Sequence, residues 1–208
     1  MPDQLSLFTE EKVQKQIYEF LFVINLPKTI NEYVKSLKDE FYERFGYFPS
    51  KGSQPHITIS KFPLIEKQPD AIISFFRRSF QKISPFEIKI NGFDSFPSSR
   101  VIYLNVENSP DLDQLKSPFN YIREDFKPKK YFHFLKDKPH ITIARGLRSD
   151  IFDEAVEDYL LRAYVNSFIV DKLTVLRRKN LGDGKYSNYE HIADLMLEGK
   201  KKSGPGGT

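Results

Sequence analysis

The sequence predicts an α+β protein made from a duplicated unit. We expect a bilobal fold with pseudo-two-fold symmetry, in which two antiparallel or mixed sheets flank a central cleft and the helices lie outside. Two observations predict this. The pentapeptide Pro-His-Ile-Thr-Ile occurs at 55–59 and again at 139–143, and such distant self-similarity indicates a unit that was built twice. Strand-like and helix-like patterns also alternate in a similar order around each copy.

The elements around the first copy are predicted from hydrophobic periodicity and from Pro and Gly boundaries. A continuous apolar run that ends at Pro27 is typical of a buried strand. The following segment has apolar residues at helical spacing and ends at Gly46. In chain order we expect a strand at 16–26, a helix at 29–46, the first motif strand at 55–62, a helix at 69–82, and strands at 85–93 and 100–106.

The elements around the second copy follow the same logic. Ser109 or Asp111 is suited to cap a third helix. The sequence Gly-Asp-Gly at 182–184 is a strong turn signal. In chain order we expect a helix at 110–126, the second motif strand at 138–145, a helix at 150–164, and a terminal hairpin with strands at 167–178 and 190–197.

The 208 residues are enough for one sizeable core. The predicted linkers are short, so we expect two lobes of one domain over residues 16–198 and not two independent domains. Residues 1–15 are predicted to be a polar lead-in, and residues 199–208 a flexible basic tail rich in Gly and Pro. We expect a monomer.

Composition indicates a cytoplasmic protein with a local anion site. The chain has no cysteine, which excludes disulfides and thiolate metal sites and fits a reducing compartment. The first residues do not resemble a signal peptide, and no apolar run approaches the ~18 residues that a membrane helix needs. Of the net charge of +4, three charges come from Lys200, Lys201 and Lys202. The nearly neutral remainder argues against sequence-independent duplex binding and leaves room for one or two phosphates.

The repeated motif places a histidine and a threonine on the same face of each strand. Side chains two residues apart in a strand point to the same side, so His56 lies with Thr58, and His140 lies with Thr142. The isoleucines between them point into the core. One such motif would be an ordinary half-buried strand. A core does not require the polar pair to repeat, so the duplication indicates that both faces serve one cleft.

Two histidines across a cleft can act as an acid–base pair. Imidazole titrates near a pKa of ~6.5, so one ring can serve as base while the other serves as acid. Phosphodiester transfer needs both, and the threonine hydroxyls can stabilise charge on the phosphate oxygens. This chemistry requires no metal and no cofactor. A zinc site is the alternative, with His133 or His191 as the third protein ligand that catalytic zinc usually has.

The paired motifs resemble the two-histidine phosphoesterase superfamily, especially its 2′-5′ RNA ligase (LigT-like) and cyclic phosphodiesterase branch. The resemblance rests on residues 22–27, on the motifs at 56–59 and 140–145, and more loosely on the hairpin at 173–197. It covers most of residues 16–197.

This resemblance implies a bilobal fold and metal-independent activity on 2′,3′-cyclic or 2′-5′ phosphodiester bonds of RNA. It implies that His56 and His140 are the acid–base pair, and that Thr58 and Thr142 bind the phosphate. The partner would be an RNA end or a small cyclic or 2′-5′ nucleotide, with no membrane involved. It leaves open which histidine is the base and whether the 2′-5′ ligase direction is used.

Several other side chains are weaker candidates for substrate contact. Arg145 and Arg148 follow the second motif, and Lys61 follows the first. Tyr186 and Tyr189 have the rings that single-stranded nucleic-acid sites use for stacking, although packing is their commoner role. The basic run at 177–179 is predicted to be a solvated strand end. His133 is expected to be a packed or loop histidine, and alternation groups His191 with the inward-facing Ala193 and Leu195.

A second interpretation is a binding module that holds an RNA end or a nucleotide in the same cleft without turnover. A pure binding module would not need two titrating groups at matched positions. Both His-Thr pairs are complete here, so the enzyme is the leading hypothesis.

Overall fold

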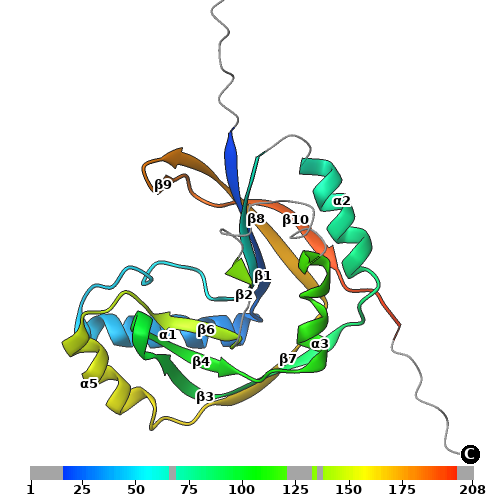
Figure 1. Ribbon diagram of the computed structural model, residues 1–208. Coiled ribbons are helices and arrows are strands. Elements are labelled where there is room, and N and C mark those ends of the chain that lie inside the picture. The colour runs from blue at the N-terminus through cyan, green and yellow to red at the C-terminus, as the bar shows by residue number, and fades with distance from the viewer. Residues whose placement is uncertain (1–15, 66–68, 121–132, 135–137, 201–208) are drawn as a thin grey trace, which may run out of the picture.

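The computed structural model describes residues 16–65, 69–120, 133–134 and 138–200. It confirms the α+β class (Figure 1). The elements are β1 (Ile17–Asn25), α1 (Lys28–Phe45), β2 (His56–Ile65), α2 (Pro69–Phe80), β3 (Phe86–Phe96), a 3₁₀ turn (Pro97–Ser99), β4 (Val101–Val106), α3 (Pro110–Gln114), β5 (His133–Phe134), β6 (His140–Ala144), α5 (Ser149–Tyr159), β7 (Val165–Val170), β8 (Lys172–Gly182), β9 (Lys185–Tyr186) and β10 (Glu190–Met196).

The strands form one hydrogen-bonded sheet with the order β10-β8-β1-β2-β6-β4-β3-β7. This differs from the two separate sheets expected from the sequence, because the motif strands β2 and β6 pair with each other at Ile57 and Ile141. We call the four strands β10-β8-β1-β2 the β2 half and the four strands β6-β4-β3-β7 the β6 half. The order is symmetric about the β2–β6 junction, so each motif strand lies at the centre.

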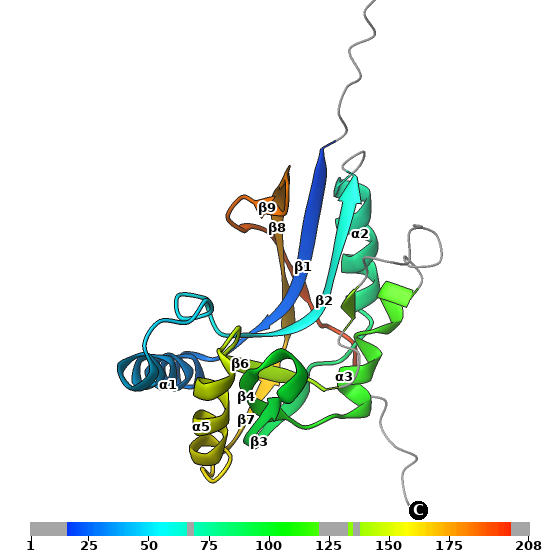
Figure 2. The ribbon, with the colours of Figure 1, turned by 60° about the vertical axis from the view of Figure 1, so that its left-hand side comes forward.

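The two halves of the sheet are not the two halves of the sequence. The last long strands, β8 and β10, return to pair beside β1 in the β2 half, whereas β3 and β4 belong to the β6 half. Among the helices, α1 crosses from one half of the sheet to the other. α1 follows β1 but contacts β6, and α5 contacts β3 and β4, while α2 contacts β10. Figure 2 shows the two halves splayed apart, with α1 and α5 beside one and α2 beside the other. The crossing of α1 ties the halves together.

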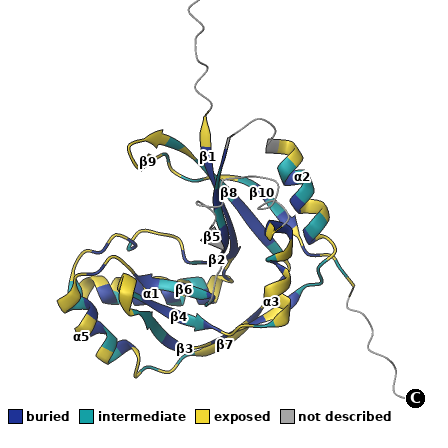
Figure 3. Cartoon of the chain, viewed as in Figure 1, coloured by how far each residue is buried: buried dark blue, intermediate teal, exposed yellow. Residues whose placement is uncertain are grey.

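An aromatic cluster fills the core between the β2 half and its helices. The ring of Phe22 lies 4.5 Å from that of Phe76 on α2 and 4.9 Å from that of Phe119. Phe62 on β2 stacks on Phe22 from the neighbouring strand, at 5.7 Å. Each such buried side chain stabilises the fold by ~1.5–3 kcal/mol. Figure 3 shows the buried residues along the central strands and the exposed residues on the outer faces of the helices.

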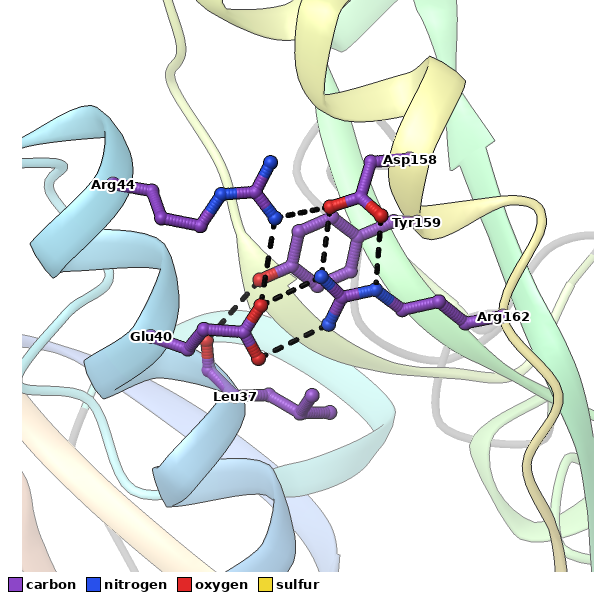
Figure 4. Close-up of polar contacts among 6 residues, drawn as sticks. All are labelled: Leu37, Glu40, Arg44, Asp158, Tyr159 and Arg162. Atoms are coloured by element: carbon purple, nitrogen blue, oxygen red, sulfur yellow. Dashed lines mark hydrogen bonds and ion pairs between the residues drawn. The ribbon is translucent and has the colours of Figure 1, made fainter.

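An ion-pair network fixes α1 against α5 (Figure 4). Arg162 binds Glu40 of α1 through two bonds, of 2.6 and 3.0 Å, and also binds Asp158 of α5 at 2.7 Å. Arg44 of α1 pairs with Asp158 as well. The guanidinium of Arg162 lies 4.1 Å from the ring centre of Tyr159, whose burial raises its pKa to about 12. The position of α1 is therefore set by contacts with the β6 half.

Two predicted elements near the second copy need correction. The Ser109 side chain caps α3 as expected, accepting from the Leu112 N–H at 3.1 Å. However, α3 ends at Gln114, one further helical segment covers 117–120, and the predicted remainder to 126 lies outside the described residues. The single strand predicted at 167–178 is two strands that break at Asp171. β7 pairs with β3, and only β8 pairs with β10.

The predicted turn at 182–184 is present, with positive φ angles at Gly182, Asp183 and Gly184, but it leads into the short β9 before β10. The lead-in at 1–15 and most of the tail lie outside the described residues. Gly199 donates its N–H to the carbonyl of Ile83 at 2.9 Å. None of the described helices is long and apolar enough to cross a membrane.

Candidate active site

The β2–β6 junction brings the two motifs into one small pocket of about 130 Å³. Its lining contains both histidines and both threonines of the motifs, together with Arg145 and the loop residues Ser53, Gln54 and Pro55. The strands are antiparallel, with Ile57 opposite Ile141. If this register is extended by one residue in each direction, His56 lies opposite Thr142 and Thr58 lies opposite His140. The polar faces of the two motifs therefore meet, while the isoleucines are buried behind them.

Both histidine rings are held in the same way by their own backbone. His56 Nδ1 lies 2.8 Å from the carbonyl oxygen of Gln54, and His140 Nδ1 lies 3.0 Å from that of Lys138. A carbonyl oxygen can only accept a hydrogen bond, so Nδ1 of each ring carries a proton. This fixes the tautomer and leaves Nε2 of each ring as the atom that exchanges protons. The repeated X-Pro-His sequence thus supplies two pre-oriented imidazoles.

Burial lowers the pKa of both histidines, because it disfavours the charged ring, and the backbone carbonyl bonds oppose this only in part. For His56 the positive charges of Lys38 and Arg145, and His140 itself, lower the pKa further. These effects favour the neutral form of both rings. A bound phosphate anion would favour protonation of one of them, since an opposite charge raises the pKa of imidazole.

Lys38 supports the His56 side and was not identified from the sequence. Its side chain comes from α1 and is 2% exposed. Its ammonium donates to the carbonyls of Ser50 and Ser53, at 3.0 and 2.7 Å, and to Ser53 Oγ at 2.9 Å. Burial lowers its pKa to about 8, and the charges of Arg145 and Lys51 add to this. The sequence did contain a signal for this role, because Lys38 lies four residues after Val34 on the apolar stripe of the helix.

The bonds of Lys38 fix the loop at 50–54, which provides the carbonyl of Gln54 to His56. The same loop reaches the second motif, because Ser50 Oγ accepts from the Arg145 N–H at 3.1 Å. β6 ends at Ala144, and the chain turns at Gly146 with a φ of +68°. This turn brings Arg145 to the pocket.

Aromatic rings support the His140 side. The ring of His140 lies edge-on to Phe96 at 5.0 Å and 5.1 Å from Tyr103. Lys138, whose carbonyl holds His140, also forms an ion pair with Asp94. Phe96 and Asp94 come from the end of β3, and Tyr103 comes from β4. No local sequence pattern indicates these contacts, because they depend on the pairing of β3 with β4.

Both threonines of the motifs have free hydroxyls. Within the part of the chain that the structure describes, Thr58 and Thr142 have no hydrogen-bond partner. Both line the pocket and are half-buried. Their hydroxyls are therefore available to donate to phosphate oxygens.

Tyr186 and Tyr189 do not line the pocket. The guanidinium of Arg178 lies 4.0 Å from the ring centre of Tyr186 and 4.6 Å from that of Tyr189. Tyr189 donates its hydroxyl to Glu19 at 2.6 Å, and Lys61 lies 3.7 Å from the same carboxylate. A β-bulge at Ile59 places Lys61 on the face of Thr58. These residues form a separate cluster farther along β2.

The remaining basic candidates lie outside the pocket lining. Arg148 pairs with the exposed Asp150 at the start of α5. The run at 177–179 lies within β8 and not at a strand end as predicted, because β8 continues to Gly182. Arg177 pairs with Glu190 at 2.7 Å.

Of the two histidines considered as a third zinc ligand, His191 does not line the pocket, and the side chain of His133 lies outside the described part of the structure. His133 is in β5, opposite Lys61 in the register. His191 was predicted to face inward, and this is wrong: a bulge between His191 and Ala193 reverses its direction, so it is exposed and 3.1 Å from Asp194. Among the described residues, no three His, Cys, Asp or Glu side chains are grouped to hold a metal ion.

An antiparallel sheet with a His-x-Thr motif on each of its two central strands, and both motifs in one pocket, defines a two-histidine phosphoesterase fold. The family model of the 2′-5′ RNA ligase superfamily matches residues 26–182. The chain belongs to this superfamily, which comprises phosphoesterases and 2′-5′ RNA ligases.

Relatives agree with this assignment. A protein of Staphylococcus aureus (strain Newman) named "Putative phosphoesterase" is 30% identical over 152 residues, which cover 72% of this chain and 84% of the relative. The crystal structure of TT0787 of Thermus thermophilus matches with a TM-score of 0.67 and 17% identity over 88% of this chain and 99% of its own. Escherichia coli LigT complexed with 3′-AMP matches with a TM-score of 0.61 and 17% identity, covering 88% and 98%. These two structures show the shared fold.

Proposed function

We propose that this protein is a metal-independent phosphoesterase that acts on 2′,3′-cyclic or 2′-5′ phosphodiester bonds of RNA by two-histidine acid–base catalysis. The observation that supports this most is the matched state of His56 and His140. In each ring Nδ1 is held by a backbone carbonyl and Nε2 is left to exchange protons, and both rings line one pocket with two free threonine hydroxyls.

The mechanism follows from these positions. For a 2′,3′-cyclic phosphate, the neutral ring takes a proton from water at Nε2 as the water oxygen bonds to phosphorus. The other ring, protonated in the presence of the phosphate, gives its Nε2 proton to the ribose oxygen as the P–O bond breaks. Thr58 and Thr142 donate to the non-bridging oxygens, where negative charge develops, and Arg145 adds a positive charge at the rim.

The ligase direction uses the same groups in the same roles as hydrolysis of the cyclic phosphate. A 5′-hydroxyl takes the place of water as the nucleophile, so a 2′-5′ linkage forms where hydrolysis would give a phosphate monoester. The reverse step cleaves a 2′-5′ linkage to a cyclic phosphate and a 5′-hydroxyl. Each histidine is base in one direction and acid in the other, because a reaction and its reverse share one transition state.

A ribonucleotide substrate is supported by the family and by the fold shared with E. coli LigT, whose structure was determined with 3′-AMP. The absence of cysteine fits activity in the cytoplasm, where we expect a monomer acting on RNA ends. The second candidate function is a module that binds the same ligands without turnover.

The test is hydrolysis of a 2′,3′-cyclic nucleotide in the presence of EDTA between pH 5 and 9. The wild type should give a bell-shaped pH profile, and His56→Ala and His140→Ala should each lower kcat by ~10²–10⁴-fold. The double variant should be little worse than either single variant, because the two groups act as a unit. His191→Ala is the matched control, since this exposed histidine pairs with Asp194 and does not line the pocket.

The alternatives give different results. Binding of cyclic nucleotide by a folded wild type without hydrolysis would favour the binding module. Loss of activity in EDTA would exclude the metal-independent mechanism.

A further inference from the structure

Each histidine of the pocket has an asparagine as its cross-strand neighbour on the side away from the pocket. Asn25 of β1 is in register with His56, and Asn105 of β4 is in register with His140. Residues in register on neighbouring antiparallel strands share a face, with Cβ atoms ~4.5–5.5 Å apart. Across the sheet, an asparagine therefore lies beside the outer edge of each histidine.

The two asparagines are equivalent under the symmetry of the sheet. The strand order places β1 outside β2 in the same way that β4 is outside β6. The asparagines are thus repeated with the His-x-Thr motifs, although the flanking residues differ. Neither was a candidate from the sequence, since a single Asn in a strand gives no signal.

Ionised Asp194 fixes the orientation of the Asn25 amide. Asn25 Nδ2 donates to Thr174 Oγ1 at 2.8 Å, and Thr174 donates to Asp194 at 2.8 Å. Burial alone would raise the pKa of Asp194, but hydrogen bonds from Lys172, His191 and Thr174 lower it to about 2. A carboxylate can only accept, so the hydroxyl proton of Thr174 points to Asp194 and its oxygen must accept from Asn25. The Oδ1 atom of Asn25 is therefore the end left free.

A backbone carbonyl fixes the Asn105 amide in the same orientation, with its nitrogen engaged and its oxygen free. Asn105 Nδ2 donates to the carbonyl oxygen of Asn91 at 3.2 Å, and this oxygen can only accept. The amide nitrogen is thus engaged, and Oδ1 is again the free end. Both asparagines are partly or fully exposed, so a ligand can reach them.

We propose that Asn25 and Asn105 are positioning residues that accept hydrogen bonds from hydroxyl groups on the two sides of the bound phosphate. The proposal rests on the proposed function, which places phosphorus between the two histidines. The entering and leaving oxygens then lie on opposite sides, each toward one asparagine. A ribose hydroxyl next to the phosphate can donate a hydrogen bond, and a neutral amide oxygen can accept that bond at any pH. A deoxyribose has no such donor, so the pair selects ribonucleotides.

The experiment compares dissociation constants for two pairs of ligands. One pair is adenosine 3′-monophosphate and its 2′-deoxy form, and the other is adenosine 2′-monophosphate and its 3′-deoxy form. Wild type should bind the hydroxyl-bearing member of at least one pair about threefold to tenfold more tightly, which is the usual effect of one neutral hydrogen bond. Asn25→Leu or Asn105→Leu should remove this preference while leaving the affinity for the deoxy ligand almost unchanged.

The matched control is Asn166→Leu, which alters an exposed asparagine of the edge strand β7 that donates to Tyr164. Thr174→Val tests the support: it should weaken the preference if that preference depends on Asn25. Equal affinities within both pairs for the wild type, or a preference that survives both Asn→Leu changes, would overturn the proposal. If the folded wild type binds neither these nucleotides nor inorganic phosphate, the proposed function itself is contradicted.

Discussion

The two sides of the pocket carry the same motif but are supported by different chemistry. His56 is held by a loop fixed from beneath by the buried ammonium of Lys38. His140 is packed against the rings of Phe96 and Tyr103, and its nearby lysine, Lys138, pairs with a carboxylate at a half-exposed position.

The difference shows which part of the site belongs to the motif and which part to its surroundings. The bond from Nδ1 to the carbonyl two residues earlier is common to both sides, since it lies within the X-Pro-His sequence. The electrostatic environment is not shared. Burial lowers the pKa of both rings, and for His56 the charges of Lys38 and Arg145 lower it further. Equal motifs therefore present two imidazoles that differ in charge environment.

Of the substitutions that distinguish the two sides, Lys38→Met is expected to have the largest effect on stability and on activity. The change removes the three hydrogen bonds that the buried ammonium donates to Ser50 and Ser53, which costs about 1–3 kcal/mol of unfolding free energy. The loop at 50–54 also loses its anchor, so kcat/KM should fall about 10- to 100-fold through misplacement of His56. Urea unfolding and steady-state kinetics measure both. The control is Lys35→Met, an exposed position on the same helix, and equal effects of the two changes would contradict the role of Lys38.

The destabilisation by Lys38→Met should also depend on pH. The pKa of Lys38 is about 8 in the folded protein and near 10.5 in the unfolded chain. Between these values the unfolded chain binds the proton and the native protein does not, so the contribution of Lys38 to stability rises with pH. The difference in unfolding free energy between wild type and variant should be larger at pH 10 than at pH 7.5. A difference that is constant or falls over this range would show that Lys38 is not desolvated.

A smaller effect is expected on the other side from Asp94→Asn. Its partner Lys138 has a side chain that is 40% exposed, and such pairs contribute less than about 1 kcal/mol. The rings of Phe96 and Tyr103 remain, so kcat/KM should change by less than about threefold. If Asp94→Asn impairs the enzyme as much as Lys38→Met, the two sides are supported alike.

The most local effect is expected from Arg145→Gln, as a change of pKa that is confined to one histidine. Removal of the positive charge should raise the pKa of His56, because that charge disfavours its protonated ring, and it should leave the pKa of His140 in place. NMR titration of the imidazole protons measures both values in one sample. Equal shifts of both rings would show that Arg145 is not specific to the His56 side.

The repeat predicted the centre of this protein because the relevant information is local. Alternation along a strand is enough to place His56 with Thr58 on one face and the isoleucines in the core, and the two copies predicted a symmetric fold. The amphipathic patterns of α1 and α2 predicted these helices for the same reason, since each apolar stripe is visible in consecutive residues.

Only the tertiary structure decided what surrounds the motifs. Strand pairing between distant segments makes one sheet instead of two, returns β8 and β10 to the β2 half, and sets Asn25 and Asn105 beside the histidines. A bulge reversed the direction of His191, which simple alternation predicts incorrectly. Such contacts depend on packing between residues far apart in the chain, and no local periodicity records them.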